Sequence, residues 1–303
     1  MDEEEFNMKR TNTILYLVVP CYNEEEVLHK SAAVLLDKLD RLIQAGTISD
    51  KSKILFINDG SKDSTWQIIY ELTRQNSKYA GLSFSRNYGH QSAILAGMMA
   101  ARSKADAVVT IDADLQQDIE ALDQFLECYQ NGCEIVYGVR SARTTDTFFK
   151  RFTAESFYHM ISMMGGEIVF NHADYRLMSK RALNELANYK EVNLFLRGIV
   201  PQIGFRTSTV EYERKERLAG ESKYPLKKML AFAIEGITSL STKPIRMITF
   251  MGIAAFFVSI GFLIWAVVDF FRGNTITGWA SMMVSLWFIG GLLLLSVGIV
   301  GEY

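Results

Sequence analysis

Apolar runs and helical patterns alternate along the first half of the chain. Continuous apolar runs at residues 53–57, 107–111 and 134–139, with others at 14–19 and 82–85, have the length and composition of buried parallel strands. Between these runs, apolar residues recur at three- and four-residue spacing, the pattern of amphipathic helices, over about residues 27–45, 64–76, 90–101 and 118–129. Strands that alternate with helices predict a doubly wound, mostly parallel α/β sheet.

The pattern is less regular after residue 139. Residues 148–164 are predicted to form a helix rich in aromatic residues and methionine, which we interpret as a core helix rather than one resting on lipid. Residues 174–177 lead into a helix at 179–188, and residues 204–213 alternate as a strand. After a polar loop at 214–224, an amphipathic helix at 225–240 is expected to lie along lipid headgroups.

The C-terminal part contains two long apolar stretches. Residues 247–268 and 275–300 contain no Asp, Glu, Lys, Arg or His. Each stretch exceeds the roughly 20 residues that a helix needs to cross a hydrocarbon core. The sequence therefore predicts a catalytic domain at 1–224, an interfacial region at 225–244 and a two-helix membrane anchor at 245–303.

The distribution of basic residues predicts the orientation in the membrane. Lys227, Lys228, Lys243 and Arg246 precede the first stretch, whereas the loop between the stretches carries only Arg272. The positive-inside rule then places residues 1–244 on the cytoplasmic side of the cell membrane.

Composition excludes some classes of function. The chain has 32 basic and 34 acidic residues, so no excess of positive charge indicates nucleic-acid binding.

Cys21, Cys128 and Cys133 lack metal-ligand spacing and are predicted to be unpaired thiols in a reducing compartment. The acidic start of the chain lacks the apolar core of a signal peptide. Because Tyr303 directly follows the second stretch without a basic anchor, a short further tail is expected.

The segment with the strongest chemical signal follows the run at residues 107–111. Asp112, Asp114 and Gln116 supply two carboxylates and a carboxamide at the point where a buried strand ends. Such oxygen donors can bind a divalent cation that in turn holds a diphosphate. The alternative is an acidic turn that caps the next helix, since Asp118 precedes an apolar helical pattern.

Two earlier strand ends carry polar signatures as well. The first strand ends in Pro-Cys-Tyr-Asn-Glu (20–24), and the second in Asn-Asp-Gly-Ser (58–61). Carboxylates there can accept hydrogen bonds from a base imide or from ribose hydroxyls. Gly60 would permit close approach of the backbone.

Taken in order along one parallel sheet, these motifs resemble the inverting glycosyltransferases of family 2, which have the GT-A nucleotide-sugar fold. With the two C-terminal stretches and the loop Gly-Glu-Ser-Lys-Tyr (220–224), the chain is similar to the polyprenyl-phosphate glycosyltransferases, the group of bactoprenol glucosyltransferases and dolichol-phosphate mannose synthases. The resemblance covers residues 13–303.

The resemblance implies a role for each motif residue on the donor side. The nucleobase site would be formed by Pro20, Tyr22, Glu24 and Asp59. Asp112 would face the ribose or the diphosphate, and Asp114 with Gln116 would hold Mg²⁺ or Mn²⁺.

The resemblance also implies phosphate-binding and catalytic residues. Arg140 would contact phosphate, with Arg143 a weaker candidate. The polar loop would close over the donor diphosphate or the lipid phosphate through Arg217, Ser222 and Lys223. Asp174 matches an acid that lies near the sugar, and the predicted catalytic set is Asp112, Asp174, Arg140, Arg217 and Lys223.

The segment at 117–119 departs from the family pattern, and His90 has a role that the motifs do not assign. The family commonly reads D-A-D-L-Q-D-P-P, whereas Gln117, Asp118 and Ile119 stand here in the last three places. That departure keeps the metal ligands and is expected to alter the start of the next helix more than the chemistry. His90 begins a predicted helix, and we favour a capping or packing role for it over catalysis.

The predicted reaction transfers one hexose from a UDP-sugar to undecaprenyl phosphate, with UDP-glucose the first candidate donor and UDP-N-acetylglucosamine the second. A polyprenyl phosphate has a second pKa near 6, so its attacking oxygen is largely ionised at neutral pH and needs no strong base. Catalysis would come from cationic screening and in-line positioning. Asp174 is therefore expected to position sugar hydroxyls or a basic partner rather than to act as a base.

Two other functions compete with this reading. A processive polysaccharide synthase of the same fold usually has a Q-x-x-R-W motif, and none follows Asp174. A non-catalytic partner of a lipid-carrier flippase would be expected to have lost its metal ligands, yet Asp112, Asp114 and Gln116 are present.

A homo-oligomer is expected because glycines in the second stretch allow close packing.

Overall fold

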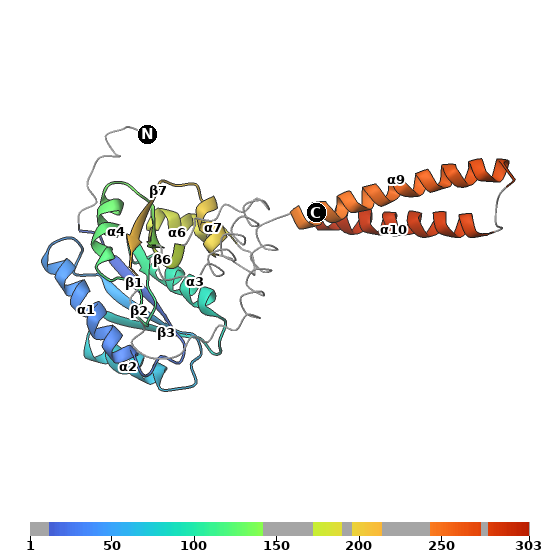
Figure 1. The fold of residues 1–303 in the computed structure, drawn as a ribbon. Helices are drawn as coiled ribbons and strands as arrows, with labels where there is room; N and C mark the ends of the chain where they lie inside the picture. The colour runs from blue at the N-terminus through green and yellow to red at the C-terminus, as the bar shows by residue number, and fades with distance from the viewer. Residues whose placement is uncertain (1–11, 142–171, 190–195, 214–242, 274–277, 303) are drawn as a thin grey trace. The chain divides into compact units, whose positions relative to one another are not determined.

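The computed structural model describes residues 12–141, 172–189, 196–213, 243–273 and 278–302 (Figure 1). The chain divides into two compact units. One comprises Met1–Tyr158 and Glu167–Lys228, and the other comprises His159–Gly166 and Met229–Tyr303. The predicted helices at 148–164 and 225–240 and the polar loop at 214–224 lie outside the described residues.

The first unit is built on a seven-stranded sheet with the strand order β3-β2-β1-β4-β6-β5-β7. Four adjacent strands are parallel, namely β1 (Leu15–Cys21), β2 (Lys53–Asn58), β3 (Tyr79–Ser83) and β4 (Ala107–Thr110). At the other end of the sheet, β5 (Ile135–Arg140) and β7 (Thr207–Tyr212) also run parallel to each other. The predicted mostly parallel α/β sheet is confirmed.

Strand β6 (His172–Ser179) is the exception, and the sequence pattern did not predict it. It runs antiparallel between β4 and β5, with Leu177 opposite both Val109 and Val136. Residues 174–179 are all buried, although Asp174, Arg176 and Ser179 are polar. A strand that buries polar side chains shows no continuous apolar run, which explains why the pattern missed it.

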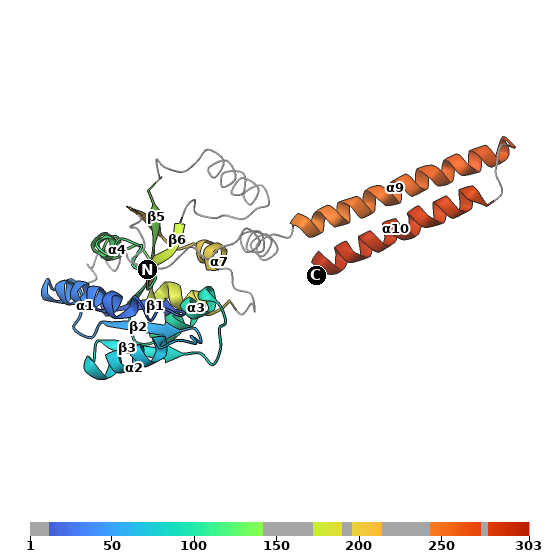
Figure 2. The same ribbon diagram turned by 60° about the horizontal axis from the view of Figure 1, so that its bottom comes forward.

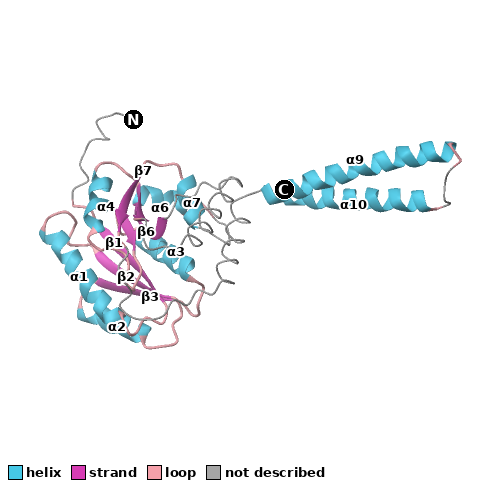
Figure 3. Cartoon of the chain, in the orientation of Figure 1, coloured by secondary structure: helices cyan, strands magenta, loops and turns pink. Residues whose placement is uncertain are grey.

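Helices cover both faces of the sheet (Figures 2 and 3). Successive strand residues point to opposite faces, so Leu15 and Leu17 join one core cluster while Tyr16 and Val18 join the other. The first cluster is closed by α1 (Leu28–Gln44), α2 (Thr65–Gln75) and α4 (Ala121–Gln130). The second is closed by α3 (His90–Ala101), α6 (Lys180–Leu186) and α7 (Leu196–Gln202). Of these six, only α7 had no counterpart among the predicted helices.

The three cysteines are unpaired, as predicted. Cys21 and Cys133 are buried, and Cys128 is half-buried. They serve as small apolar side chains in the first core cluster or against it.

A buried lysine ties α1 to α4. Lys38 is 2% exposed, and its Nζ lies 2.7 Å from both Glu120 Oε2 and Asp123 Oδ2. Arg41 adds a contact of 2.8 Å between Nη2 and Glu120 Oε1. The hydrogen bonds from Arg41 and then Lys38 lower the pKa of Glu120 to about 2.

This network predicts an acid-dependent loss of stability. Because the pKa of Glu120 is lower in the folded state than the value of about 4.3 in an unfolded chain, Glu120 stabilises the fold above that pH. The contribution disappears as the pH falls from about 4.3 toward 2, and solvent screening of a half-exposed side chain limits it to about 1 kcal/mol. We expect Glu120→Gln to lower the free energy of unfolding at pH 7 and to flatten its decline below pH 4.

Urea unfolding of the full chain in detergent, measured from pH 7 to pH 3, tests this expectation. Glu71→Gln is the control, since Glu71 is exposed on α2 and contacts the neutral Gln67. Parallel stability curves for Glu120→Gln and the unsubstituted protein would contradict the assignment.

The second unit contains α9 (Lys243–Phe271) and α10 (Trp279–Glu302), which pack against each other. Glycines lie at the contact: a Cβ at Gly291 would meet the main chain of Phe256, and one at Gly252 would meet that of Leu295. Residues Ile248–Asp269 are long and apolar enough to cross a membrane, whereas the apolar stretch found in the described part of α10, Val284–Gly298, is shorter. One candidate span is therefore present, and the second stays a prediction.

Candidate functional site

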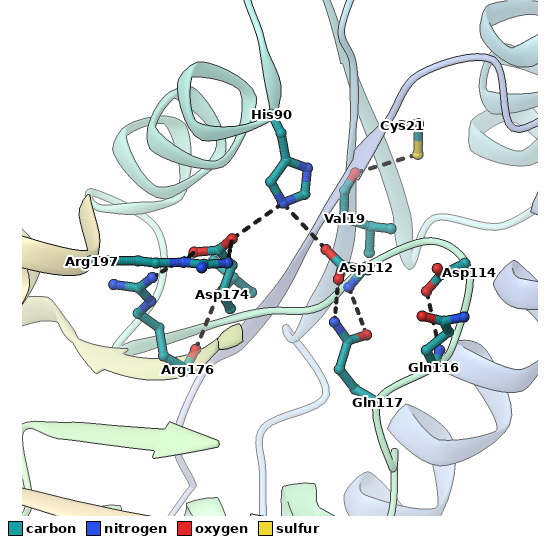
Figure 4. A network of polar contacts seen from close by, with 11 residues as sticks. Val19, Cys21, His90, Asp112, Asp114, Gln116, Gln117, Asp174, Arg176 and Arg197 are labelled. Carbon is teal, nitrogen blue, oxygen red and sulfur yellow. Dashed lines mark hydrogen bonds and ion pairs between the residues drawn. The ribbon is translucent and has the colours of Figure 1, made fainter. Parts of the chain in front are cut away.

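The polar strand ends converge at one edge of the sheet. Parallel strands β1, β2 and β4 bring their carboxyl ends to the same edge, which is where open α/β sheets bind ligands. Because β6 is antiparallel, its first residues lie at this edge, and Arg176 stands opposite Thr110. Asp112 and Asp174 therefore lie close to each other and to His90, the first residue of α3 (Figure 4).

Asp112 is held on both sides. Gln117 donates from Nε2 to Asp112 Oδ2, and its Oε1 accepts a hydrogen bond of 3.1 Å from the backbone N–H of Asp112. The other carboxylate oxygen, Oδ1, lies 3.4 Å from His90 Nε2. Burial raises the pKa of Asp112, and the charges of Asp174 and Asp114 raise it further, against the effects of His90 and Gln117.

Asp174 is surrounded by cations. Its side chain is 8% exposed, and Arg197 contacts both carboxylate oxygens, with Nε 3.1 Å from Oδ1 and Nη2 2.9 Å from Oδ2. The fully buried Arg176 donates from Nη2 to Oδ1 at 2.9 Å. Burial alone would raise the pKa of Asp174, but the charges of Arg197, Arg176 and His90 and the hydrogen bonds from Arg197 hold it well below its usual range. Asp174 is thus an ionised acceptor and a poor proton acceptor for catalysis.

His90 stands between the two acids. Its Nε2 lies 3.4 Å from Asp112 and 3.7 Å from Asp174, and 43% of its side chain is exposed. The segment that leads into α3 is fixed by Asp59, whose carboxylate accepts from the backbone N–H groups of Tyr88 at 2.7 Å and Gly89 at 3.0 Å. From the sequence we favoured a capping or packing role for His90. Its position next to Asp112 and Asp174 also makes it part of the candidate site.

The predicted metal ligands lie on the turn after β4. Asp114 is half-buried and its Oδ1 accepts from the backbone N–H of Gln116 at 3.1 Å. Leu115, between them, has a φ of 52°. The described residues contain no group of three His, Cys, Asp or Glu side chains arranged for a metal ion. Two protein oxygens fit Mg²⁺ or Mn²⁺ when substrate phosphates and water complete the shell.

The predicted nucleobase residues occupy different environments. Pro20 is buried in β1 opposite Ile57, whereas Tyr22 is 42% exposed just beyond the strand end. The backbone N–H of Glu24 donates to Thr65 Oγ1 at 2.8 Å, which anchors the loop to α2. Asp59 is buried and already binds two backbone N–H groups. Gly60, with a φ of 63°, permits close approach of the main chain at Arg86.

The predicted phosphate-binding residues are only partly described. Arg140 is the last residue of β5 and lies half-buried opposite Tyr212. Since β5 runs parallel to β4, Arg140 lies at the same edge of the sheet as Asp112. The remaining candidates lie outside the described residues, namely Arg143, Arg217, Ser222 and Lys223.

Sequence reasoning did not assign Gln117, Arg176 or Arg197 to the site. Gln117 was noted only as a departure from the family pattern, and its place beside Asp112 shows that the departure touches the site as well as the next helix. Arg176 follows Asp174 by two residues, the spacing that places two side chains on one face of a strand. Arg197 is a single basic residue within an apolar segment and carried no sequence signal.

The sheet, its two helical layers and the acids at its carboxyl edge have the arrangement of the GT-A fold. The profile of Glycosyl transferase family 2 matches residues 16–187, more than half of the chain. The protein belongs to glycosyl transferase family 2.

Relatives match along nearly the whole chain. The uncharacterized glycosyltransferase YkoT of Bacillus subtilis (strain 168) is 52% identical over 296 residues, which cover 98% of this chain and 88% of that protein. The prophage bactoprenol glucosyl transferase homolog of Escherichia coli (strain K12) is 39% identical, covering 95% of this chain and 92% of its own length. The bactoprenol glucosyl transferase of Shigella phage SfX is 40% identical with the same coverages. The likeness therefore extends beyond the sheet into the C-terminal helices.

Proposed function

We propose that the protein transfers a hexose from a UDP-sugar to a polyprenyl phosphate, such as undecaprenyl phosphate, with inversion at the sugar carbon. The observation that carries this proposal is that Asp112 and Asp174 both lie beside His90 at the carboxyl edge of the sheet, with Arg197 paired to Asp174. Relatives named bactoprenol glucosyl transferases support the lipid acceptor and make glucose the first candidate sugar. The apolar residues Ile248–Asp269 are consistent with an enzyme that works on a membrane-bound substrate.

The donor would bind across the ends of β1, β2 and β4. Asp112 would face the ribose or the diphosphate, and Pro20, Tyr22, Glu24 and Asp59 would form the surroundings of the base. Asp114 and Gln116 would hold Mg²⁺ or Mn²⁺, which when bound would neutralise charge on the diphosphate.

The acceptor phosphate attacks carbon 1 of the sugar from the face opposite the diphosphate. A new carbon–oxygen bond forms to the lipid phosphate, the bond to the diphosphate breaks, and its electron pair leaves with UDP. The attacking oxygen is largely ionised at neutral pH, so no proton has to be removed. The low pKa of Asp174 suits it to accept hydrogen bonds from sugar hydroxyls. Arg140, Arg217 and Lys223 would screen phosphate charge, with Arg143 a weaker candidate. Ser222, on the same loop as Arg217 and Lys223, would help to close the loop over phosphate.

The membrane arrangement belongs to the same proposal. We place the catalytic unit at the cytoplasmic face of the cell membrane, anchored by two spans. A homo-oligomer fits the proposal as well, because two spans form only a thin anchor and their glycines allow close packing. Both features remain predictions.

Release of UDP by the purified full-length protein tests the proposal. The protein in detergent would be incubated with undecaprenyl phosphate and a panel of UDP-sugars, with Mg²⁺, with Mn²⁺ or with a chelator. We expect release that requires lipid, metal and one particular sugar, and NMR of the product should show the inverted anomer. Measurable nucleotide binding without release from any UDP-sugar would overturn the proposal, and it would favour another donor nucleotide or the non-catalytic partner.

A further inference from the structure

Gln117 contacts Asp112 at two points that differ in chemistry. Its amide nitrogen donates to the carboxylate at Oδ2, while its amide oxygen accepts from the backbone N–H of the same residue at 3.1 Å. The turn between them, with Leu115 at a φ of 52°, returns the chain so that two residues five positions apart face each other. Gln117 is 3% exposed, so the pairing is enclosed by protein.

The carboxamide of Gln117 supplies both the donor and the acceptor that this pair of contacts requires. A carboxylate could accept from the backbone N–H but would repel the Asp112 carboxylate, and a cationic side chain could donate but could not accept. His90, the first residue of α3, lies 3.4 Å from Asp112 Oδ1, whereas Gln117, on the turn after β4, contacts Oδ2. The plane of the carboxylate is thereby set by residues that do not themselves need to touch a substrate.

We propose that Gln117 is a positioning residue for sugar transfer, which fixes the Asp112 carboxylate in the orientation that binds the donor. This inference rests on the proposed function, in which Asp112 faces the ribose or diphosphate of the donor. Figure 4 shows Gln117 and His90 on opposite sides of Asp112, with the Asp174 cluster beyond His90. Gln117 acts through Asp112, so its effect should depend on the chemistry at position 112.

The kinetic test is Gln117→Glu, which keeps the size and the acceptor but removes the donor. We expect the KM for the UDP-sugar to rise about 10- to 100-fold, by analogy with the loss that follows when a residue supporting a metal-ligating side chain is replaced. The KM for the polyprenyl phosphate should stay unchanged, because Asp112 serves the donor. Gln67→Glu is the matched control, since Gln67 also donates to a carboxylate, that of Glu71 at 2.8 Å, but on the exposed face of α2. Equal rises in both KM values, or an unchanged donor KM, would overturn the inference.

A second readout needs no substrate and separates this inference from the proposed function. Gln117→Glu places two carboxylates in contact and should lower the thermal midpoint of the full chain. Asp112→Asn in the same protein should restore the midpoint, because the new amide can donate to Glu at position 117. Calorimetric titration with UDP and Mn²⁺ should show weaker binding by Gln117→Glu even if the sugar or the acceptor has been misassigned. Absence of thermal rescue, or unchanged UDP affinity, would show that Gln117 does not position Asp112.

Discussion

Asp114→Ala should reduce metal-dependent sugar transfer by about 10²- to 10³-fold, the range observed when one contact to a developing charge is lost. Asp114 lies half-buried after β4, on the turn that also carries Gln116. In the proposed reaction two anions meet, and the cation that Asp114 would hold offsets their repulsion. The fold should survive, because the hydrogen bond lost with Gln116 N contributes only about 1 kcal/mol.

The measurement is UDP release as a function of Mn²⁺ concentration, with the thermal midpoint recorded in parallel. Asp118→Ala is the matched control, because Asp118 is a half-buried acid on the same segment that is not a predicted ligand. It should keep its metal dependence. Full Mn²⁺-dependent release by Asp114→Ala would remove Asp114 from the metal site.

Arg197→Ala should slow turnover by about 100-fold, a loss expected when the support of a site residue is removed. Arg197 donates hydrogen bonds to both carboxylate oxygens of Asp174, at 2.9 and 3.1 Å. Together with Arg176 it keeps this buried acid ionised. Without Arg197 the pKa of Asp174 rises, although Arg176 and His90 still lower it. As the pH is lowered, the activity of the variant should therefore begin to fall at a higher pH than that of the unsubstituted protein.

The free energy of unfolding should depend on pH through the same shift in the pKa of Asp174. A folded-state pKa held below the unfolded value of about 3.9 adds stability above that pH and loses it as the pH falls. Removing Arg197 should cost about 3 kcal/mol at pH 7, the low end for a broken buried pair, because Arg176 remains.

Two further variants separate charge from geometry. Arg197→Lys keeps the charge but cannot contact both oxygens in the same plane, so it should recover stability more than turnover. Arg181→Ala is the control outside the site, because Arg181 packs over the Phe205 ring at 4.6 Å. A native rate and an unchanged pH profile for Arg197→Ala would show that Asp174 does not need this partner.

The apolar runs predicted the parallel strands because a strand buried on both faces has to be apolar throughout. β1, β2 and β4 accordingly lie within two residues of their predicted ends, and α3 has its predicted bounds. β3 begins three residues before its predicted start, since an edge strand with exposed positions shows a weaker signal. Helix α7 was missed because a seven-residue helix is too short to show periodicity.

The sequence by itself determined that acids follow the ends of parallel strands, which is a local property of chain order. It therefore located Asp112, Asp114 and Gln116 at one edge of the sheet. The tertiary structure decided their partners. Antiparallel β6 brings Asp174 to that edge from the opposite direction, and α7 and α3 add Arg197 and His90. These contacts join residues separated by 22 to 84 positions, or depend on a turn as at Gln117, so no periodicity in the sequence encodes them.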